Sequence, residues 1–373
     1  MGWDTVSNKE DLKSRLQDMA DNILEQVKKD DSDEKQEKRL LIPTGSILLN
    51  LACSDHIEGG WGAGKISNLI GDSSSGKTLL ALSMFAECAQ RSEFDEYDFI
   101  YDDVEQACEF DMSKLFGSRV KDRIQAPHYE DGTALYSDTI QQFHANVFSA
   151  IQSGRPFIYV LDSFDALTSS EELGRAEESA KATRDGKELK GSYRMEKPKL
   201  VSEMLRQIKA RLRETGSFLL IISQTRDNID PMSFEKKTRS GGRALRFYSS
   251  HEVWMALAGK IKSRDRVIGS NVKVKVTKNK LTGKQRSVQF PIYYDYGADD
   301  LGSCIDFLVD DGYWSKKGDK IIAKEIGMEG TRKKLIVDIE GEIGAAQRIY
   351  ETTQTCWQEI EQSLKLDRKP KYE

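Results

Sequence analysis

The sequence predicts an α/β fold built on a mainly parallel sheet. Short apolar runs of strand length alternate with stretches that carry apolar residues at helical spacing. A glycine-rich segment follows the first well-defined run and precedes a helix. Strands that alternate with helices are typical of a parallel sheet with helices on both faces. We expect an N-terminal helical arm (residues 1–39), a core (40–300) and a small C-terminal domain (301–373).

The composition is that of a globular protein with a well-solvated surface. Of the 373 residues, 38% are hydrophobic and 31% are charged, and the formal net charge is −5. No run is long enough to span a membrane, and the N-terminus lacks the apolar segment of a secretory signal. The cysteines and histidines are scattered, which argues against a disulfide framework or a zinc site and favours a cytoplasmic location.

The N-terminal arm is predicted to be one amphipathic helix. Apolar residues recur at helical spacing between Leu12 and Val27, and Ser7 and Glu10 stand where a capping box would start the helix. A single helix cannot bury its apolar stripe alone. It either packs on its own core or docks on a neighbouring subunit, and the sequence leaves both options open.

The glycine-rich segment has the spacing of a phosphate-binding loop, with two glycines separated by four residues and followed by Lys and Thr. It follows an apolar run (65–70) and precedes a helical one (79–86), which is the context that this loop requires. The alternative interpretation is a glycine-serine turn on the surface that binds no phosphate. Lys77 is expected to reach the β- and γ-phosphates of a nucleotide and Thr78 to bind Mg²⁺. The predicted nucleotide-binding residues are Gly71, Asp72, Ser73, Ser74, Ser75, Gly76, Lys77 and Thr78.

Three further strands end in polar residues that would meet at the same edge of the sheet. Glu105 follows the strand 97–101 and is the candidate to polarise the attacking water, although an acidic surface loop is an equal alternative. Asp162 ends the strand 156–163 and is expected to hold Mg²⁺ together with Thr78. Gln224 ends the strand 217–224, where it is placed to sense the γ-phosphate.

The remaining pattern supports the parallel sheet and adds two basic loops. Residues 271–278 alternate strictly as a fifth strand, and residues 200–213 read as a helix. Two long polar segments, 169–199 and 225–242, follow core strands and should leave the sheet at one edge. Together they could line a path for a single-stranded phosphate backbone. For either segment considered alone, a solvated surface loop is slightly favoured over a DNA-binding loop.

From about residue 41 to 314, the ordered set of motifs resembles the RecA family of recombinases. The lead-in (43–46), the phosphate-binding loop, the strand ending in Asp162 and the segment 240–248 all carry the resemblance. The resemblance implies that Glu105 is the catalytic glutamate, that Gln224 couples the γ-phosphate to the second DNA loop, and that Lys278 and Lys280 reach ATP on the adjacent subunit. It also implies DNA contacts in the second loop, at Arg226, Lys236, Lys237, Arg239, Gly241, Gly242 and Arg243.

Several residues depart from the family pattern. The first loop is long, so its DNA contacts cannot be transferred, and the C-terminal tail is basic. Met112 stands where the family often has a tyrosine that stacks on adenine. By this position, we assign Met112 to the site that binds the adenine base. Ser233 replaces a usual aromatic residue and has Phe234 beside it. These departures indicate a divergent member, and a phage source is one explanation for them.

The resemblance implies an ATP- and Mg²⁺-dependent recombinase. Such a protein forms a helical filament of many copies on single-stranded DNA and pairs it with homologous double-stranded DNA. Two alternatives remain open at this point. One is a RecA-like regulatory ATPase that modulates another filament without exchanging strands, and the other is a ring-forming DNA motor. The residues after 314 show helical spacing over 338–364, for which packing on the core is the preferred interpretation over partner binding.

Overall fold

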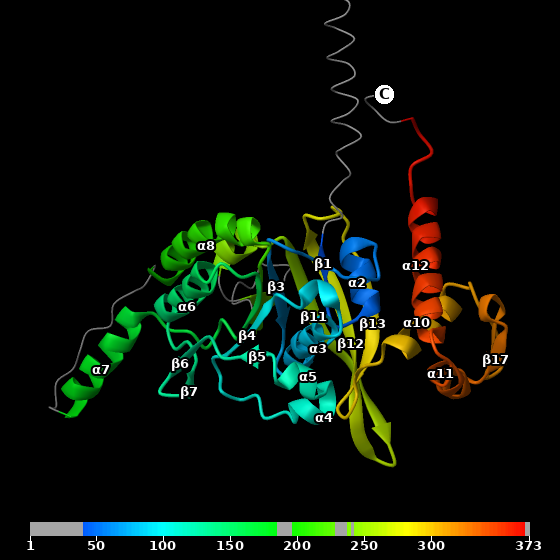
Figure 1. The fold of residues 1–373 in the computed structure, drawn as a ribbon, viewed down its shortest axis with the longest axis horizontal. Helices are drawn as coiled ribbons and strands as arrows, with labels where there is room; N and C mark the ends of the chain where they lie inside the picture. Colours follow the sequence, from blue (N-terminus) through cyan, green and yellow to red (C-terminus); the bar gives the residue numbers. More distant parts are fainter. Residues whose placement is uncertain (1–39, 185–195, 228–236, 240–241, 370–373) are drawn as a thin grey trace, which may run out of the picture. The chain divides into compact units, whose positions relative to one another are not determined.

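The computed structural model describes residues 40–184, 196–227, 237–239 and 242–369. The predicted N-terminal arm therefore lies outside the described residues. A ten-stranded sheet dominates the described chain, in the order β14-β13-β12-β11-β3-β9-β8-β4-β5, with β10 paired to β9 (Figure 1). No helix in these ranges is both long and apolar enough to cross a bilayer.

One half of the sheet is parallel, as predicted. β3 pairs with β9, β9 with β8, β8 with β4 and β4 with β5, all in parallel. Apolar side chains point to both faces of these strands and are buried, because helices cover both faces. The strands of this half are β3 (Ile66–Gly71), β4 (Asp98–Asp103), β5 (Ile124–Gln125), β8 (Phe157–Asp162) and β9 (Phe218–Asp227).

The other half is antiparallel apart from the pairing of β11 with β3, which is parallel. The predicted strand 271–278 lies within β12, whose alternating valines are buried and whose alternating lysines are exposed. Its neighbours β11 and β13 were not predicted from the sequence. The strands of this half are β11 (His251–Ser263), β12 (Arg266–Asn279), β13 (Ser287–Tyr293) and β14 (Gly297–Ala298).

Helices pack on both faces of the parallel half. Two adjacent residues of β4 show this, because successive strand residues point to opposite faces. Phe99 contacts Phe85 of α3 (Lys77–Ala89), with ring centroids 5.3 Å apart. Ile100 joins a cluster formed with α6 (Ile140–Gln152) and α8 (Glu196–Thr215).

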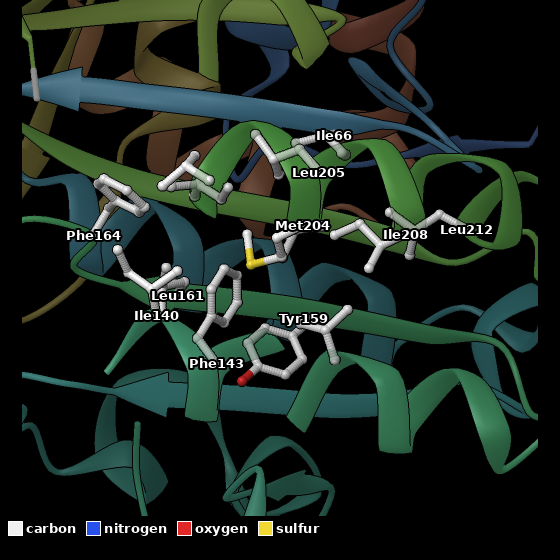
Figure 2. Packing of buried hydrophobic residues seen from close by; sticks show 14 of the residues in the cluster. Ile66, Ile140, Phe143, Tyr159, Leu161, Phe164, Met204, Leu205, Ile208 and Leu212 are labelled. Atoms are coloured by element: carbon white, nitrogen blue, oxygen red, sulfur yellow. The ribbon is translucent and has the colours of Figure 1, made fainter. Parts of the chain in front are cut away.

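A cluster of buried apolar side chains lies between α6, α8 and the sheet (Figure 2). Residues of α8 at helical spacing, Met204, Leu205 and Ile208, meet Phe143 of α6 and Tyr159 of β8. Each such side chain contributes about 1.5–3 kcal/mol by leaving water. This packing supports the pairing of β8 with β9, the two strands that carry Asp162 and Gln224.

The first predicted loop is largely helical, which corrects the sequence interpretation. Residues Ser170–Arg184 form α7, and α8 begins at Glu196, before the predicted residue 200. A capping box explains the start of α7, because Glu172 N donates to Ser169 Oγ (3.1 Å) and Ser169 N donates to Glu172 Oε2 (3.3 Å). The segment has few apolar residues. It therefore lacks the apolar residues at helical spacing from which a helix is predicted. Residues 185–195 lie outside the description.

The C-terminal residues pack on the core. The predicted helical stretch 338–364 divides into α11 (Arg332–Glu340) and α12 (Ala345–Ser363), and Ile343 between them is fully exposed. Trp357 of α12 packs against Phe307, with ring centroids 5.9 Å apart, and donates its indole N–H to Asp55 Oδ1 at 3.0 Å. The other elements of this part are α10 (Asp300–Asp310), β15 (Ser315–Lys317), β16 (Lys320–Ala323), η2 (Lys324–Ile326) and β17 (Met328–Gly330).

Shorter elements complete the described chain and connect the layers. Among them, α2 precedes the β2–β3 segment and α9 follows the second predicted loop. Their bounds are β1 (Leu41–Ile42), α2 (Ile47–Ser54), β2 (Trp61–Gly62), η1 (Ser92–Phe94), α4 (Met112–Phe116), α5 (Ser118–Lys121), β6 (His128–Glu130), β7 (Thr133–Leu135), β10 (Lys237–Arg239) and α9 (Gly242–Tyr248).

Candidate functional site

The phosphate-binding loop connects β3 directly to α3. A side chain at Gly71 would meet Ser75 Oγ at 2.6 Å and the carbonyl oxygen of Met255 at 2.7 Å, so only glycine fits. Gly76 has φ +88° and starts α3, a conformation that favours glycine. The first free N–H groups of α3 therefore face the loop, which is the arrangement that binds phosphate oxygens.

Lys77 folds back over this loop. Its Nζ donates to the carbonyl oxygens of Gly71 (3.0 Å) and Asp72 (2.7 Å). Burial lowers the pKa of Lys77, and the nearby carboxylates of Asp162 and Glu105 oppose that change. The ammonium group is thus held between backbone carbonyls and acidic side chains at the place where phosphate oxygens would replace the carbonyls.

Thr78 and Asp162, the two residues predicted to hold Mg²⁺, are in direct contact. Thr78 Oγ1 donates to Asp162 Oδ2 at 2.6 Å, and the Tyr101 hydroxyl donates to the same oxygen at 3.1 Å. Burial raises the pKa of Asp162, while these two hydrogen bonds lower it. A hydroxyl and a carboxylate oxygen side by side are the hard ligands that Mg²⁺ prefers. The residues present therefore fit the ion, and Tyr101 is a positioning residue that the sequence analysis missed.

Glu105 and Gln224 are also brought together. Gln224 Nε2 donates to Glu105 Oε1 at 2.9 Å, and Ser163 Oγ donates to the same oxygen at 2.5 Å. The contact arises because β8 pairs both with β4, which Glu105 follows, and with β9, which carries Gln224. Asp165, which was not predicted, accepts the backbone N–H of Gln224 at 2.6 Å and fixes the start of the second loop.

A cavity of about 360 Å³ extends from the phosphate-binding loop toward β12 and β13. The aromatic residues that line it are Phe110 and Tyr294, and its apolar wall includes Val272 and Ile292. Met112, the residue assigned to the base, starts α4 and does not line this cavity. Phe110 stands two residues before it, so the aromatic residue was present in the sequence but displaced from the position expected of the family.

The comparison with protein families matches residues 25–299 to the RecA N-terminal domain. Protein RecA from Caulobacter sp. (strain K31) is 31% identical over 314 residues, which cover 82% of this chain and 80% of that protein. The chain belongs to the RecA family. Protein RecA from Geobacter metallireducens is 30% identical over 317 residues, covering 83% of this chain and 85% of that protein. Family membership supports ATP binding, DNA binding and a role in recombination and repair.

The segment between β9 and α9 is the one predicted to form the second DNA loop. β10 pairs antiparallel with the end of β9, with Lys237 opposite Asp227 and Arg239 opposite Thr225. Arg226 is exposed and lies 3.4 Å from Asp165 Oδ1. Arg243 is exposed near the start of α9, which begins at Gly242. Lys236, Gly241 and the side chain of Arg239 lie outside the description.

Lys237 is the member of this set that contacts the phosphate-binding loop. Its ammonium group forms an ion pair with Asp72 of the phosphate-binding loop. The sequence analysis assigned Lys237 to DNA and Asp72 to the nucleotide, and nothing in the sequence suggested that the two residues would meet. Their contact depends on the pairing of β10 with β9 beside β3.

Lys278 and Lys280 lie away from their own phosphate-binding loop. Both ammonium groups donate to carbonyl oxygens at the C-terminus of α9: Lys278 to Arg246 and Phe247 (3.2 Å), and Lys280 to Phe247 (3.1 Å). Burial, with the neighbouring charge of Lys280, lowers the pKa of Lys278 to about 8. The register places Lys278 beside Glu252, which is opposite Asn68 on β3, while the loop begins beyond Gly71.

The aromatic lining of the cavity leads to a prediction about base recognition. Tyr294→Ala should weaken ATP binding by about 1 kcal/mol, roughly five-fold, because a stacked ring is lost. Met112→Ala should leave the affinity unchanged. Competition of ATP and of inorganic tripolyphosphate against a fluorescent ATP analogue measures both effects, since tripolyphosphate has no base and should bind both variants as it binds the wild type. A loss at Met112 and none at Tyr294 would contradict the assignment.

Proposed function

We propose that this RecA-family protein assembles on single-stranded DNA as an ATP-dependent filament and promotes homologous pairing and strand exchange. The observation that carries the proposal is the hydrogen bond between Gln224 and Glu105. Gln224 belongs to the strand that continues into the second DNA loop, and Glu105 lies beside the phosphate-binding loop. A single contact therefore links the residue proposed to orient water with the segment proposed to bind DNA.

The roles of the site residues follow from their contacts. The N–H groups of the loop and the ammonium group of Lys77 would bind the β- and γ-phosphates. Thr78 and Asp162 would hold Mg²⁺, which neutralises phosphate charge when it is bound. Glu105 would accept a hydrogen bond from the attacking water and place it in line with the γ-phosphate. Gln224 would couple the binding of the γ-phosphate to the conformation of the second loop.

Lys278 and Lys280 are proposed to act on the adjacent subunit. Lys278 is opposite Glu252 of β11, which is opposite Asn68 of β3, so two strand spacings separate Lys278 from β3. Gly71 lies three residues further along β3 than Asn68, a distance of about 10 Å at ~3.3 Å per residue. A neighbouring copy can instead present its nucleotide to them. Assembly would then complete each site, which makes the filament depend on ATP.

The function is tested by incubating the full-length protein with ATP, Mg²⁺ and single-stranded DNA and adding homologous duplex. We expect helical filaments by electron microscopy and joint molecules that require ATP and homology. Filaments that hydrolyse ATP but form no joint molecules would overturn strand exchange and leave a regulatory ATPase. Closed rings that enclose DNA would overturn the filament in favour of a DNA motor.

A further inference from the structure

A carboxylate in the phosphate-binding loop is electrostatically unfavourable for a loop that binds a triphosphate. Asp72 is the second residue of this loop, and its backbone carbonyl already accepts a hydrogen bond from Lys77. Its side chain is close enough to Lys77 for the two charges to interact. A free carboxylate at this place would repel the phosphates that Lys77 is expected to bind.

One residue of β9 and one residue of β10 donate hydrogen bonds to the carboxylate of Asp72. Thr225 Oγ1 donates to one oxygen and Lys237 Nζ donates to the other. Thr225 directly follows Gln224, and Lys237 is the first residue of the strand that returns from the second loop. The hydrogen bonds from Lys237 and Thr225 hold the pKa of Asp72 below its usual value. Both edges of the second loop are thus tied to the phosphate-binding loop.

We propose that Asp72 and Lys237 form a positioning pair through which the second DNA loop sets the affinity of the phosphate-binding loop for nucleotide. In this role Lys237 compensates the charge of Asp72 and does not bind a DNA phosphate. The inference rests on the ATP-dependent DNA binding proposed above. It reassigns Lys237 from the DNA surface to the nucleotide site, and it explains how the loop tolerates an acidic residue.

The pair differs from the other cations of the second loop. Arg226 lies near Asp165, outside the phosphate-binding loop, and Arg243 is exposed with no acidic partner among the described residues. The side chains of Lys237 and Asp72 are each about half exposed, at 48% and 47%. Solvent therefore screens their interaction, and the expected effect on affinity is modest.

The test is a double-mutant cycle on the full-length protein. The affinity for a fluorescent ATP analogue with Mg²⁺ is measured without DNA for the wild type, Lys237→Gln, Asp72→Asn and the double variant. Lys237→Gln should weaken binding about two- to five-fold, because it leaves Asp72 uncompensated. The double variant should return to the wild-type affinity, and Lys237→Arg should retain it. Lys262→Gln, which removes an exposed cation of β11 without touching Asp72, is the matched control and should have no effect in this assay.

The dependence of single-stranded DNA affinity on salt supplies an independent readout. Lys237→Gln should leave the slope unchanged, because its ammonium group is held by Asp72. Asp72→Asn should release that group and steepen the slope by about 0.7, the value for one further phosphate contact on a single strand. The proposal is overturned if Lys237→Gln flattens the slope by about this amount and leaves nucleotide affinity intact.

Failure of the pair and failure of the proposed function give different results. If the wild type binds nucleotide but no DNA, the proposed function is wrong, and the DNA-free cycle still decides the pair. If the wild type binds both and the cycle shows no coupling between the two positions, only the pair is wrong. If the wild type binds no nucleotide, both are overturned.

Discussion

Replacing Glu105 by glutamine is expected to lower ATP hydrolysis by a factor of about 10²–10⁴, the usual contribution of a positioned acid–base group. The amide oxygen of glutamine can still accept the hydrogen bonds that Ser163 and Gln224 donate to Glu105 Oε1. The site should therefore keep its geometry and its affinity for ATP. What the amide lacks is the negative charge that polarises the attacking water. Single-turnover hydrolysis and equilibrium nucleotide binding, measured with saturating DNA, separate the two effects.

Two further variants serve as comparisons for Glu105→Gln. Glu109→Gln removes an exposed carboxylate four residues away and should hydrolyse ATP at the wild-type rate. Lys77→Ala should instead weaken ATP binding itself, because the phosphates lose their principal cation. Normal hydrolysis by Glu105→Gln would show that the water is positioned by another group.

Protein that carries both Lys278→Ala and Lys280→Ala is expected to bind ATP but to lose DNA-stimulated hydrolysis and filament growth. The reason is that each subunit would no longer complete the site of its neighbour. Mixing this protein with Lys77→Ala protein should restore part of the activity. At some interfaces of the mixed filament, an intact Lys77 from one subunit would face intact Lys278 and Lys280 from the other. Hydrolysis as a function of the mixing ratio is the measurement.

This experiment needs controls because the two lysines also cap α9. The free N–H and C=O groups of a helix end need partners, so their loss could loosen the helix. Partial recovery in the mixture shows that the double variant is folded and assembles. Lys260→Ala with Lys262→Ala removes two exposed cations from β11 and should have no effect. Co-assembly without recovery, or wild-type hydrolysis by the double variant alone, would place the lysines outside the site.

The fold was largely predictable because its signals are local. Four of the parallel strands, β3, β4, β8 and β9, are apolar runs with a residue of recognisable chemical role at or near the C-terminal end, whereas the two-residue β5 was not predicted. The antiparallel strands β11 and β13 were missed, and only part of β12 was found. α7 was missed for a different reason. Its start depends on the capping contacts between Ser169 and Glu172, and few apolar side chains mark its length.

The sequence by itself determined the family and predicted the phosphate end of the site. Gly71, Gly76, Lys77 and Thr78 lie within one short segment, so their spacing is enough to predict their roles. Asp162 was predicted to hold Mg²⁺ because a chain with a phosphate-binding loop is expected to place a metal-binding carboxylate at the end of a buried strand.

Only the tertiary structure decided which distant residues complete that site. The pairing of β8 with both β4 and β9 brings Gln224 to Glu105, and the pairing of β10 with β9 beside β3 brings Lys237 to Asp72. The cavity wall that includes Tyr294 comes from strands far along the chain from the loop. These contacts follow from strand register, which depends on the packing of the whole sheet, and no short segment of sequence specifies it.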